Sequence, residues 1–269
     1  MEVNFYNEVD DSLFLFSVIA ARYRNKWIFC KQKKKTTWEL PGGTREKGES
    51  ILTYAKRELQ EESGALQFNI EPVCAYSVVG KTKKNPGGSE SFGMLYFADV
   101  TSISENLDSE MEKIILVDEL EETWTYPEIQ PLLLEQVKIY LFLKKFYETL
   151  SFKKDEFIKK ELRDLFSKDA LLLDQNSKKT QTIDAYMSEF NEIITSYPIL
   201  FKKGFKEKQL SFEVIEKKGN TILICSNYEK RYTKENQDFI EYGENYITME
   251  KKNDTFEILN ISYLDDIEK

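Results

Sequence analysis

Three glutamates near residue 60 form the part of this sequence that is best suited to catalysis. Glu58, Glu61 and Glu62 lie in the run RELQEES, residues 57–63. Carboxylates that are gathered away from bulk water repel one another and lose hydration, so they need protons or cations. A site with only oxygen ligands suits Mg²⁺ or Mn²⁺. The run therefore predicts a metal site built from carboxylates.

A helix over residues 51–62 would hold these glutamates at one end. At about 100° per residue, Glu62 falls inside an apolar stripe, Glu58 lies at its edge, and Glu61 lies one step outside it. The other members of the stripe are Ile51, Leu52, Ala55 and Leu59. Two of the three carboxylates should therefore point toward the core.

Turn and capping residues flank this predicted helix. Pro41-Gly42-Gly43 can end a preceding strand and bring the backbone close to a ligand. Glu49 and Ser50 suit the first turn of a helix, and Gly64 suits its C-terminal cap. The sequence therefore predicts a turn, followed by a helix that ends at Gly64.

A charged helix on the surface, with Arg57 and Glu61 as an ordinary ion pair, is the usual interpretation of such a run. The spacing of the whole segment from Gly43 to Ala65 favours a different interpretation. Gly43, five residues, Glu49, seven residues and then the run over 57–65 resemble the Nudix box. Ala65 is the one soft match, because the family prefers a larger aliphatic residue there. The preceding WELPG, residues 38–42, is similar to the strand that leads into the box.

The resemblance implies a metal-dependent enzyme that cleaves a diphosphate bond in a nucleotide with water. It implies that Glu58, Glu61 and Glu62 bind Mg²⁺ (or Mn²⁺), and that the backbone carbonyl of Gly42 adds a ligand. Metal ions neutralise a diphosphate and activate water, which agrees with the residue types.

The resemblance also implies supporting residues and a base. Arg57 and Glu49 are expected to support the helix and loop. Glu61 is the expected base, because it lies off the packed stripe. Many members of the family use one further glutamate from a loop before a late strand. Glu110 is the first candidate for it here, by position alone, and Glu112 is the second.

The composition excludes several classes of function. The chain has 269 residues, a formal net charge of −9 and no histidine. An acidic chain is unsuited to broad binding of nucleic-acid polymers or anionic membranes. Without histidine there is no Ser-His-Asp or Cys-His catalysis, and no histidine metal site.

The remaining signals favour a reduced, cytoplasmic location. Cys30, Cys74 and Cys225 are far apart and show no metal-ligand spacing, so we expect reduced thiols. The N-terminus is acidic and lacks a basic signal region. The apolar run over residues 13–21 is too short to span a bilayer.

The chain is long enough for two domains, and the sequence predicts an α+β fold in both. Residues 1–150 are expected to form a Nudix α/β/α sandwich with a mixed sheet. Strands are expected over residues 13–23, 26–32, 37–40, 67–79, 92–100 and 114–117, with a solvated basic loop over 33–35 and a closing helix over 128–150.

Residues 151–269 have a different pattern. Helices over 155–166 and 182–197 precede strands near 208–216, 221–232, 238–250 and 255–264. With the segment over 165–172, this order resembles the cone-shaped α+β fold of nuclear transport factor two, ketosteroid isomerase and SnoaL-like proteins, with a curved antiparallel sheet. Catalysis in that fold needs placed acids or a His-Asp pair. We therefore expect a binding or dimerisation role, with a homodimer through this domain.

Four other functions are alternatives to the hydrolysis of a nucleoside triphosphate. A sensor with the same fold would bind a nucleotide without cleaving it, but would not need a metal cluster. A prenyl diphosphate isomerase would need histidine, and RNA decapping conflicts with the net charge. Pyrophosphatase activity on ADP-ribose or a sugar nucleotide ranks after oxidised purine triphosphates.

Overall fold

The computed structural model describes residues 1–81, 85–104, 111–121, 123–151, 160–196, 205–234 and 237–265. It consists of two compact units, Met1–Lys138 and Ile139–Lys269. The division falls inside the long helix α2 (Gln130–Leu150), whereas the sequence placed a boundary after it. None of the described helices is long and apolar enough to cross a bilayer.

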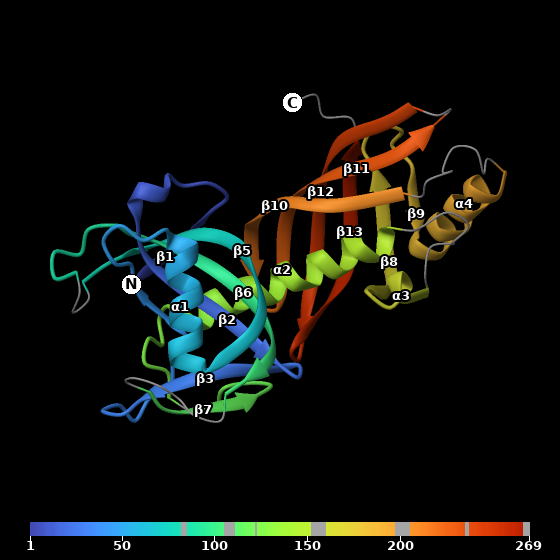
Figure 1. Cartoon of the computed structure of the whole chain (residues 1–269). Helices are drawn as coiled ribbons and strands as arrows, with labels where there is room; N and C mark the ends of the chain where they lie inside the picture. The colour runs from blue at the N-terminus through green and yellow to red at the C-terminus, as the bar shows by residue number, and fades with distance from the viewer. Residues whose placement is uncertain are drawn as a thin grey trace. The chain divides into compact units, whose positions relative to one another are not determined.

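The first unit is built on a seven-stranded mixed sheet (Figure 1). Six of its strands follow the order β1-β5-β6-β2-β3-β7. The seventh strand, β4, lies outside this order and pairs with β2. β2 and β6 are parallel neighbours at the centre, and the other pairs are antiparallel. The strands are β1 (Glu2–Tyr6), β2 (Phe14–Tyr23), β3 (Lys26–Gln32), β4 (Gly42–Thr44), β5 (Ala65–Val79), β6 (Ser91–Ile103) and β7 (Met111–Val117).

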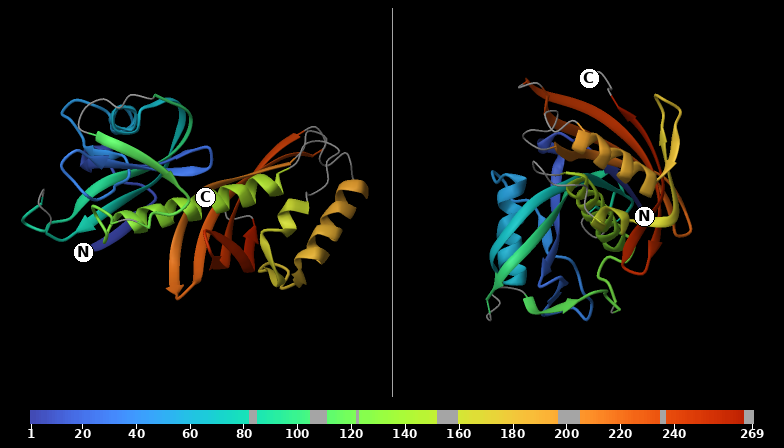
Figure 2. Two further views of the ribbon diagram at one scale, coloured as in Figure 1. Left: turned by 90° about the horizontal axis from the view of Figure 1, so that it is seen from below. Right: turned by 90° about the vertical axis from the view of Figure 1, so that its right-hand side faces the viewer.

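Helices cover both faces of this sheet. Helix α1 (Ile51–Ser63) packs through Ala55 and Leu59 against the face that carries Tyr96 and Ala98. Side chains alternate along a strand, so Leu95 and its partner Cys74 face the other way. Gln136, in the first half of α2, hydrogen-bonds Cys74 there. Figure 2 shows the two helices on opposite sides of the strands. The predicted sandwich of a mixed sheet between helices is confirmed.

Local chemistry accounts for the central hairpin. β2 and β3 are joined by Arg24 and Asn25, both with positive φ values of 52° and 63°. Two such residues form the kind of tight turn that matches the twist of paired strands. Strands β2 and β3 therefore agree with their predicted ranges almost to the residue. β1 was not predicted, and the strand expected over 37–40 is reduced to isolated bridges at Trp38 and Glu39.

The second unit has a six-stranded sheet in the order β10-β11-β12-β13-β8-β9. Register shifts interrupt several of its pairings, and such bulges bend strands. A structural core of apolar side chains lies on one face, and α3, α4 and the second half of α2 all contribute to it. Its elements are α3 (Lys160–Arg163), β8 (Phe166–Asp174), β9 (Thr180–Thr182), α4 (Ile183–Ser196), β10 (Phe205–Lys218), β11 (Thr221–Lys234), β12 (Gln237–Lys252) and β13 (Thr255–Asp265).

The four strands expected at the end of the chain form the predicted antiparallel meander, and two details of this unit differ from the expectation. The helix expected over 155–166 is limited, within the described residues, to Lys160–Arg163, and Phe166 already begins strand β8. The sheet is not purely antiparallel, because β8 pairs with β13 in the parallel sense. Phe166, Ala170 and Leu172 are buried in the core, and β13 offers their segment a strand partner that is remote in sequence. The α+β class itself is confirmed.

Candidate functional site

Helix α1 is defined by its two caps. At its start, the Ser50 hydroxyl accepts a hydrogen bond from Thr53 N–H at 3.1 Å. At its end, Gly64 adopts a left-handed φ of 70° and donates its N–H to the Gln60 carbonyl. Such caps satisfy backbone groups that the helix leaves unpaired. They fix the two ends of α1, whose last two turns carry the three glutamates.

Glu62 points inward, as the helical pattern predicts. It is 8% exposed, and its Oε2 accepts a hydrogen bond from the Gly42 N–H at 2.8 Å. Gly42 opens strand β4, so a buried carboxylate and the glycine loop are in direct contact. Leu52, by contrast, was placed in the apolar stripe but is exposed.

Glu58 lies beside the second glycine of the loop. A Cβ added at Gly43 would lie 3.4 Å from Glu58 Oε2 and 2.4 Å from the Tyr54 hydroxyl. That hydroxyl hydrogen-bonds Glu58. Burial raises the pKa of Glu58, whereas Tyr54 and Arg57 lower it. Gly43 therefore leaves the space in which the carboxylate and the hydroxyl meet.

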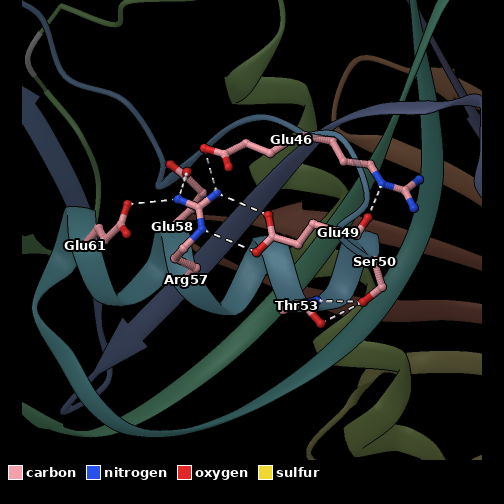
Figure 3. A network of polar contacts seen from close by, with 8 residues as sticks. Glu46, Glu49, Ser50, Thr53, Arg57, Glu58 and Glu61 are labelled. Atoms are coloured by element: carbon pink, nitrogen blue, oxygen red, sulfur yellow. Dashed lines mark hydrogen bonds and ion pairs between the residues drawn. The ribbon is translucent and has the colours of Figure 1, made fainter.

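Arg57 is the centre of an acidic network (Figure 3). Its Nη1 lies 3.0 Å from Glu58 Oε1 and 3.0 Å from Glu61 Oε2. On its other side the guanidinium contacts Glu49 at 3.2 Å and Glu46 at 3.4 Å. The hydrogen bond to Glu49 is the main cause that raises the pKa of Arg57. One cation thus joins the loop before α1 to the carboxylates at its end.

The three glutamates that the sequence offers as the catalytic base, Glu61, Glu112 and Glu110, lie in different parts of the chain. Glu61 keeps 43% of its side chain exposed, so it faces outward, as the helical pattern predicts. Glu112 lies in β7, where it pairs with Lys31 at 2.8 Å, a contact that lowers the pKa of Glu112. Glu110 lies outside the described residues. Within the part of the chain that the structure describes, no contact joins Glu112 to the carboxylates of α1.

One buried acid at the site was missed from the sequence. Glu39 is 5% exposed and pairs with Lys35 at 3.0 Å, so Lys35 is not simply part of a solvated basic loop. The negative charge of Glu39 contributes to raising the pKa of both Glu62 and Cys30. The signal that could have found the pair is its spacing of four residues, with Glu39 set between the apolar Trp38 and Leu40.

The donor set at the end of α1 is suited to a hard divalent cation. All of its side-chain ligands would be carboxylate oxygens, the type that Mg²⁺ and Mn²⁺ prefer. Glu58 and Glu61 already converge on one cationic nitrogen of Arg57. Among the described residues, however, no group of three or more acids or cysteines is arranged as a complete metal site. The chemistry fits, and the contacts with Arg57 Nη1 use one oxygen of each carboxylate, Glu58 Oε1 and Glu61 Oε2.

The protonation of Glu62 depends strongly on its surroundings. Burial raises the pKa of Glu62 to about 8, and the charges of Glu58 and Glu39 act in the same direction. The Gly42 N–H and the charge of Lys35 oppose this shift. Near neutral pH, Glu62 therefore holds a proton in the metal-free protein, and a cation would have to displace it.

This shift predicts how the metal-free protein responds to pH. The folded state binds the Glu62 proton more tightly than the unfolded state, so folding should become less stable as pH rises from about 4.5 to about 8. Glu62→Gln should remove this loss, on the order of a few kcal/mol. Thermal unfolding in a chelator between about pH 5 and about pH 9 measures it. Glu46→Gln, which alters an exposed acid, should keep the wild-type slope, and an equally steep slope in Glu62→Gln would contradict the assignment.

Comparison with known proteins identifies the first unit. The NUDIX domain model matches residues 14–141. A Bacillus subtilis protein named "Putative 8-oxo-dGTP diphosphatase YtkD" is 27% identical over 135 residues, which are 49% of this chain and 79% of that protein.

Solved structures give weaker similarities. The pyrophosphohydrolase BsRppH of Bacillus subtilis aligns with a TM-score of 0.43 and 21% identity, over 51% of this chain and 90% of that one. The NUDIX domain of Shewanella oneidensis NrtR, crystallised with ADP ribose, aligns with a TM-score of 0.40 and 16% identity, over 48% of this chain and 88% of that one. The match of the family model covers α1, its caps and the glycine loop. Residues 14–141 therefore form a NUDIX domain.

Proposed function

We propose that the N-terminal unit hydrolyses a diphosphate bond in a nucleoside triphosphate or a related nucleotide, with Mg²⁺ or Mn²⁺. The observation that carries this proposal is the set of carboxylates at the end of α1. Glu62 is buried against Gly42 N–H, while Glu58 and Glu61 share one nitrogen of Arg57. Such a cluster is costly without a cation, and a protein that only bound a nucleotide would not need it.

In this proposal, Glu58, Glu61 and Glu62 hold the ion, with the Gly42 carbonyl as a further ligand. A divalent ion there would supply positive charge for the diphosphate oxygens and lower the pKa of a bound water. Arg57 and Glu49 do not touch the substrate but tie the loop to the helix through their ion pair. Their role is to position the glutamates.

The substrate class we propose is an oxidised purine nucleoside triphosphate. The support is the name of the Bacillus subtilis relative, which refers to 8-oxo-dGTP. The test is a panel of 8-oxo-dGTP, dGTP, ATP, ADP-ribose and a UDP-sugar with Mg²⁺, with products separated by chromatography. We expect cleavage of triphosphates to the monophosphate and pyrophosphate, with the highest kcat/KM for 8-oxo-dGTP. Preferential cleavage of ADP-ribose or the UDP-sugar would overturn the substrate class but keep the reaction.

A nucleotide sensor is the second candidate, and the same panel separates it from the enzyme. A sensor would bind one of these nucleotides in calorimetry and cleave none of them with Mg²⁺ or Mn²⁺. For the C-terminal unit we propose a cone-shaped binding domain that also forms a homodimer. The apolar core under its bent sheet supports the first part of this proposal.

Proton transfer gives a further prediction within this proposal. Glu61 is our candidate base, because its side chain is half-exposed, whereas Glu62 is buried. Loss of the base should flatten the acidic limb of the pH–rate profile, whereas loss of a ligand should mainly raise the metal requirement. We expect Glu61→Gln to flatten that limb and Glu110→Gln to leave it unchanged. The reverse pattern would transfer the role to Glu110.

A further inference from the structure

The C-terminal unit contains a cavity of about 420 Å³, and all of its lining residues lie between Phe146 and Tyr263. One face of the six-stranded sheet bounds the cavity, together with α3, α4 and the end of α2. An apolar cavity of about 150 Å³ holds one benzene ring, so this one has room for about two or three fused rings. Its volume also lies within the range of about 300–1,000 Å³ that is typical of small-molecule sites.

The charged side chains that line the cavity are engaged within the protein. Lys230 on β11 lies directly opposite Glu207 on β10 and Glu241 on β12, so it is the cross-strand neighbour of both. Opposite charges at such positions attract each other. Glu241 also accepts a hydrogen bond from the Tyr232 hydroxyl, and Asp174 accepts hydrogen bonds from the turn after β8. Among the described residues, the lining therefore offers no spare charge for an ionic ligand.

Aromatic rings form much of the cavity wall. Tyr186 stacks on Phe190 with ring centroids 5.9 Å apart, and Phe190 meets Phe205 edge-on at 5.8 Å. Tyr228 lies over the backbone of Gly243, where an added Cβ would lie 2.3 Å from its ring. Aromatic rings attract one another through such offset faces and edges. The wall therefore favours a ligand that itself contains aromatic rings.

One buried amide interrupts this wall. Asn245 on β12 is 5% exposed and lines the cavity, and its Nδ2 donates to the Tyr147 hydroxyl at 3.0 Å. Tyr147 is not a lining residue, and its hydroxyl donates in turn to Ser226 Oγ at 3.0 Å, so the bonded side of the amide faces into the wall. Asn245 Oδ1 accepts no hydrogen bond from the described part of the chain, yet it is not one of the fully enclosed polar atoms that lack a partner. This oxygen therefore faces the cavity.

The Oδ1 of Asn245 defines the polar group that a ligand should carry. An amide oxygen is a hydrogen-bond acceptor, so its partner must be a donor such as a hydroxyl. A buried acceptor that lacks a donor costs free energy, so a ligand that supplies one gains affinity. The donor should be uncharged, because a charged group would leave water for a wall whose own charges are already engaged.

We propose that this cavity binds an uncharged aromatic molecule of about two or three fused rings that carries a hydroxyl group, with the hydroxyl donating to Asn245 Oδ1. The proposal rests on the binding role proposed above for the C-terminal unit, and not on hydrolysis by the NUDIX domain. It makes the second unit a receptor for a neutral ring compound rather than a second nucleotide site.

The test compares naphthol, which is uncharged near neutral pH, with methoxynaphthalene, which has the same rings but no donor. Titrations of the full chain, followed by the fluorescence of the probe, should give a Kd for naphthol that is lower by about fivefold, the effect of one hydrogen bond. Naphthoate and naphthylmethylamine should each bind at least about tenfold more weakly than naphthol. Equal or tighter binding of methoxynaphthalene or of a charged probe would overturn the ligand class, and no binding of any probe would overturn the binding role as well.

Asn245→Leu tests the hydrogen bond. The change roughly keeps side-chain size, so both neutral probes should still bind, but the preference for naphthol over methoxynaphthalene should disappear. Asn227→Leu is the matched control, because Asn227 lies on the neighbouring strand β11, donates to Ser211 Oγ and does not line the cavity. It should keep the preference. A preference that persists in Asn245→Leu, or that is lost in Asn227→Leu, would overturn the proposal.

Tyr186→Ala tests the wall without touching the buried network. Tyr186 lines the cavity from a partly exposed position on α4, so its removal should leave the unit folded. We expect the Kd of naphthol and that of methoxynaphthalene to rise together by at least about threefold, with their ratio unchanged, because the lost ring contacts the rings of both probes. Unchanged Kd values would show that the probes bind elsewhere and would overturn the proposal.

Discussion

Glu62→Gln and Glu61→Gln should each lower kcat by at least about a hundredfold while the fold stays intact. Both changes remove a negative charge without changing side-chain volume. In Glu62→Gln, the amide oxygen of the new side chain can still accept the Gly42 N–H bond that Glu62 accepts at 2.8 Å, so the buried contact is kept. Steady-state kinetics with Mg²⁺ and the best substrate of the panel measure the effect.

The control for this result is Glu46→Gln. Glu46 also contacts Arg57, but its side chain is 72% exposed and it belongs to the loop before α1. Its change should alter kcat by no more than about twofold, since exposed ion pairs contribute little. Near-normal turnover in both Glu61→Gln and Glu62→Gln, with circular dichroism and unfolding temperature unchanged, would refute the assignment of these carboxylates.

The largest expected effect on stability is at Gly42. This residue has φ of +148°, and an added Cβ would lie 2.2 Å from the Ser17 carbonyl oxygen and 3.0 Å from Val18 Cα. These are backbone atoms of the central strand β2, which cannot move without disturbing the sheet. Gly42→Ala should therefore destabilise the first unit by about 3 kcal/mol or more. Denaturant unfolding, followed by the fluorescence of its tryptophans, measures the change.

Gly48→Ala is the matched comparison. Gly48 also has a positive φ, of +87°, but nothing lies within 4 Å of the position that an added Cβ would take. That change should cost only the backbone strain, about 1–2 kcal/mol. The difference between the two variants isolates the close approach of the glycine loop to β2. Equal destabilisation would mean that this approach is not required.

Sequence patterns predicted α1 well because its signals are local. Ser50 and Gly64 mark its ends, and the period of the helix places Glu62 inward and Glu61 outward. The hairpin at Arg24 and Asn25 is local in the same way. Leu52 shows the limit of the approach, because a helical stripe does not reveal how wide its partner surface is.

Features that depend on distant partners were not predicted. Strand β8 pairs in parallel with β13, which is remote in sequence, whereas the residues around Leu165 are also compatible with a helix. Glu39 becomes part of the site only through burial and through Lys35, and its neighbours in sequence gave no catalytic motif. Tyr54 was likewise missed as a partner of Glu58. In each case the missing information was a tertiary contact.

The central claim, that the carboxylates of α1 hold the ion that hydrolysis needs, is tested most directly by the binding of Mn²⁺. Electron paramagnetic resonance in the presence of a non-hydrolysable nucleoside triphosphate analogue measures this binding. We predict that wild-type protein binds Mn²⁺ and that Glu58→Gln and Glu62→Gln each weaken binding by at least about tenfold, while Glu112→Gln does not. Unchanged Mn²⁺ affinity in both α1 variants would contradict the claim.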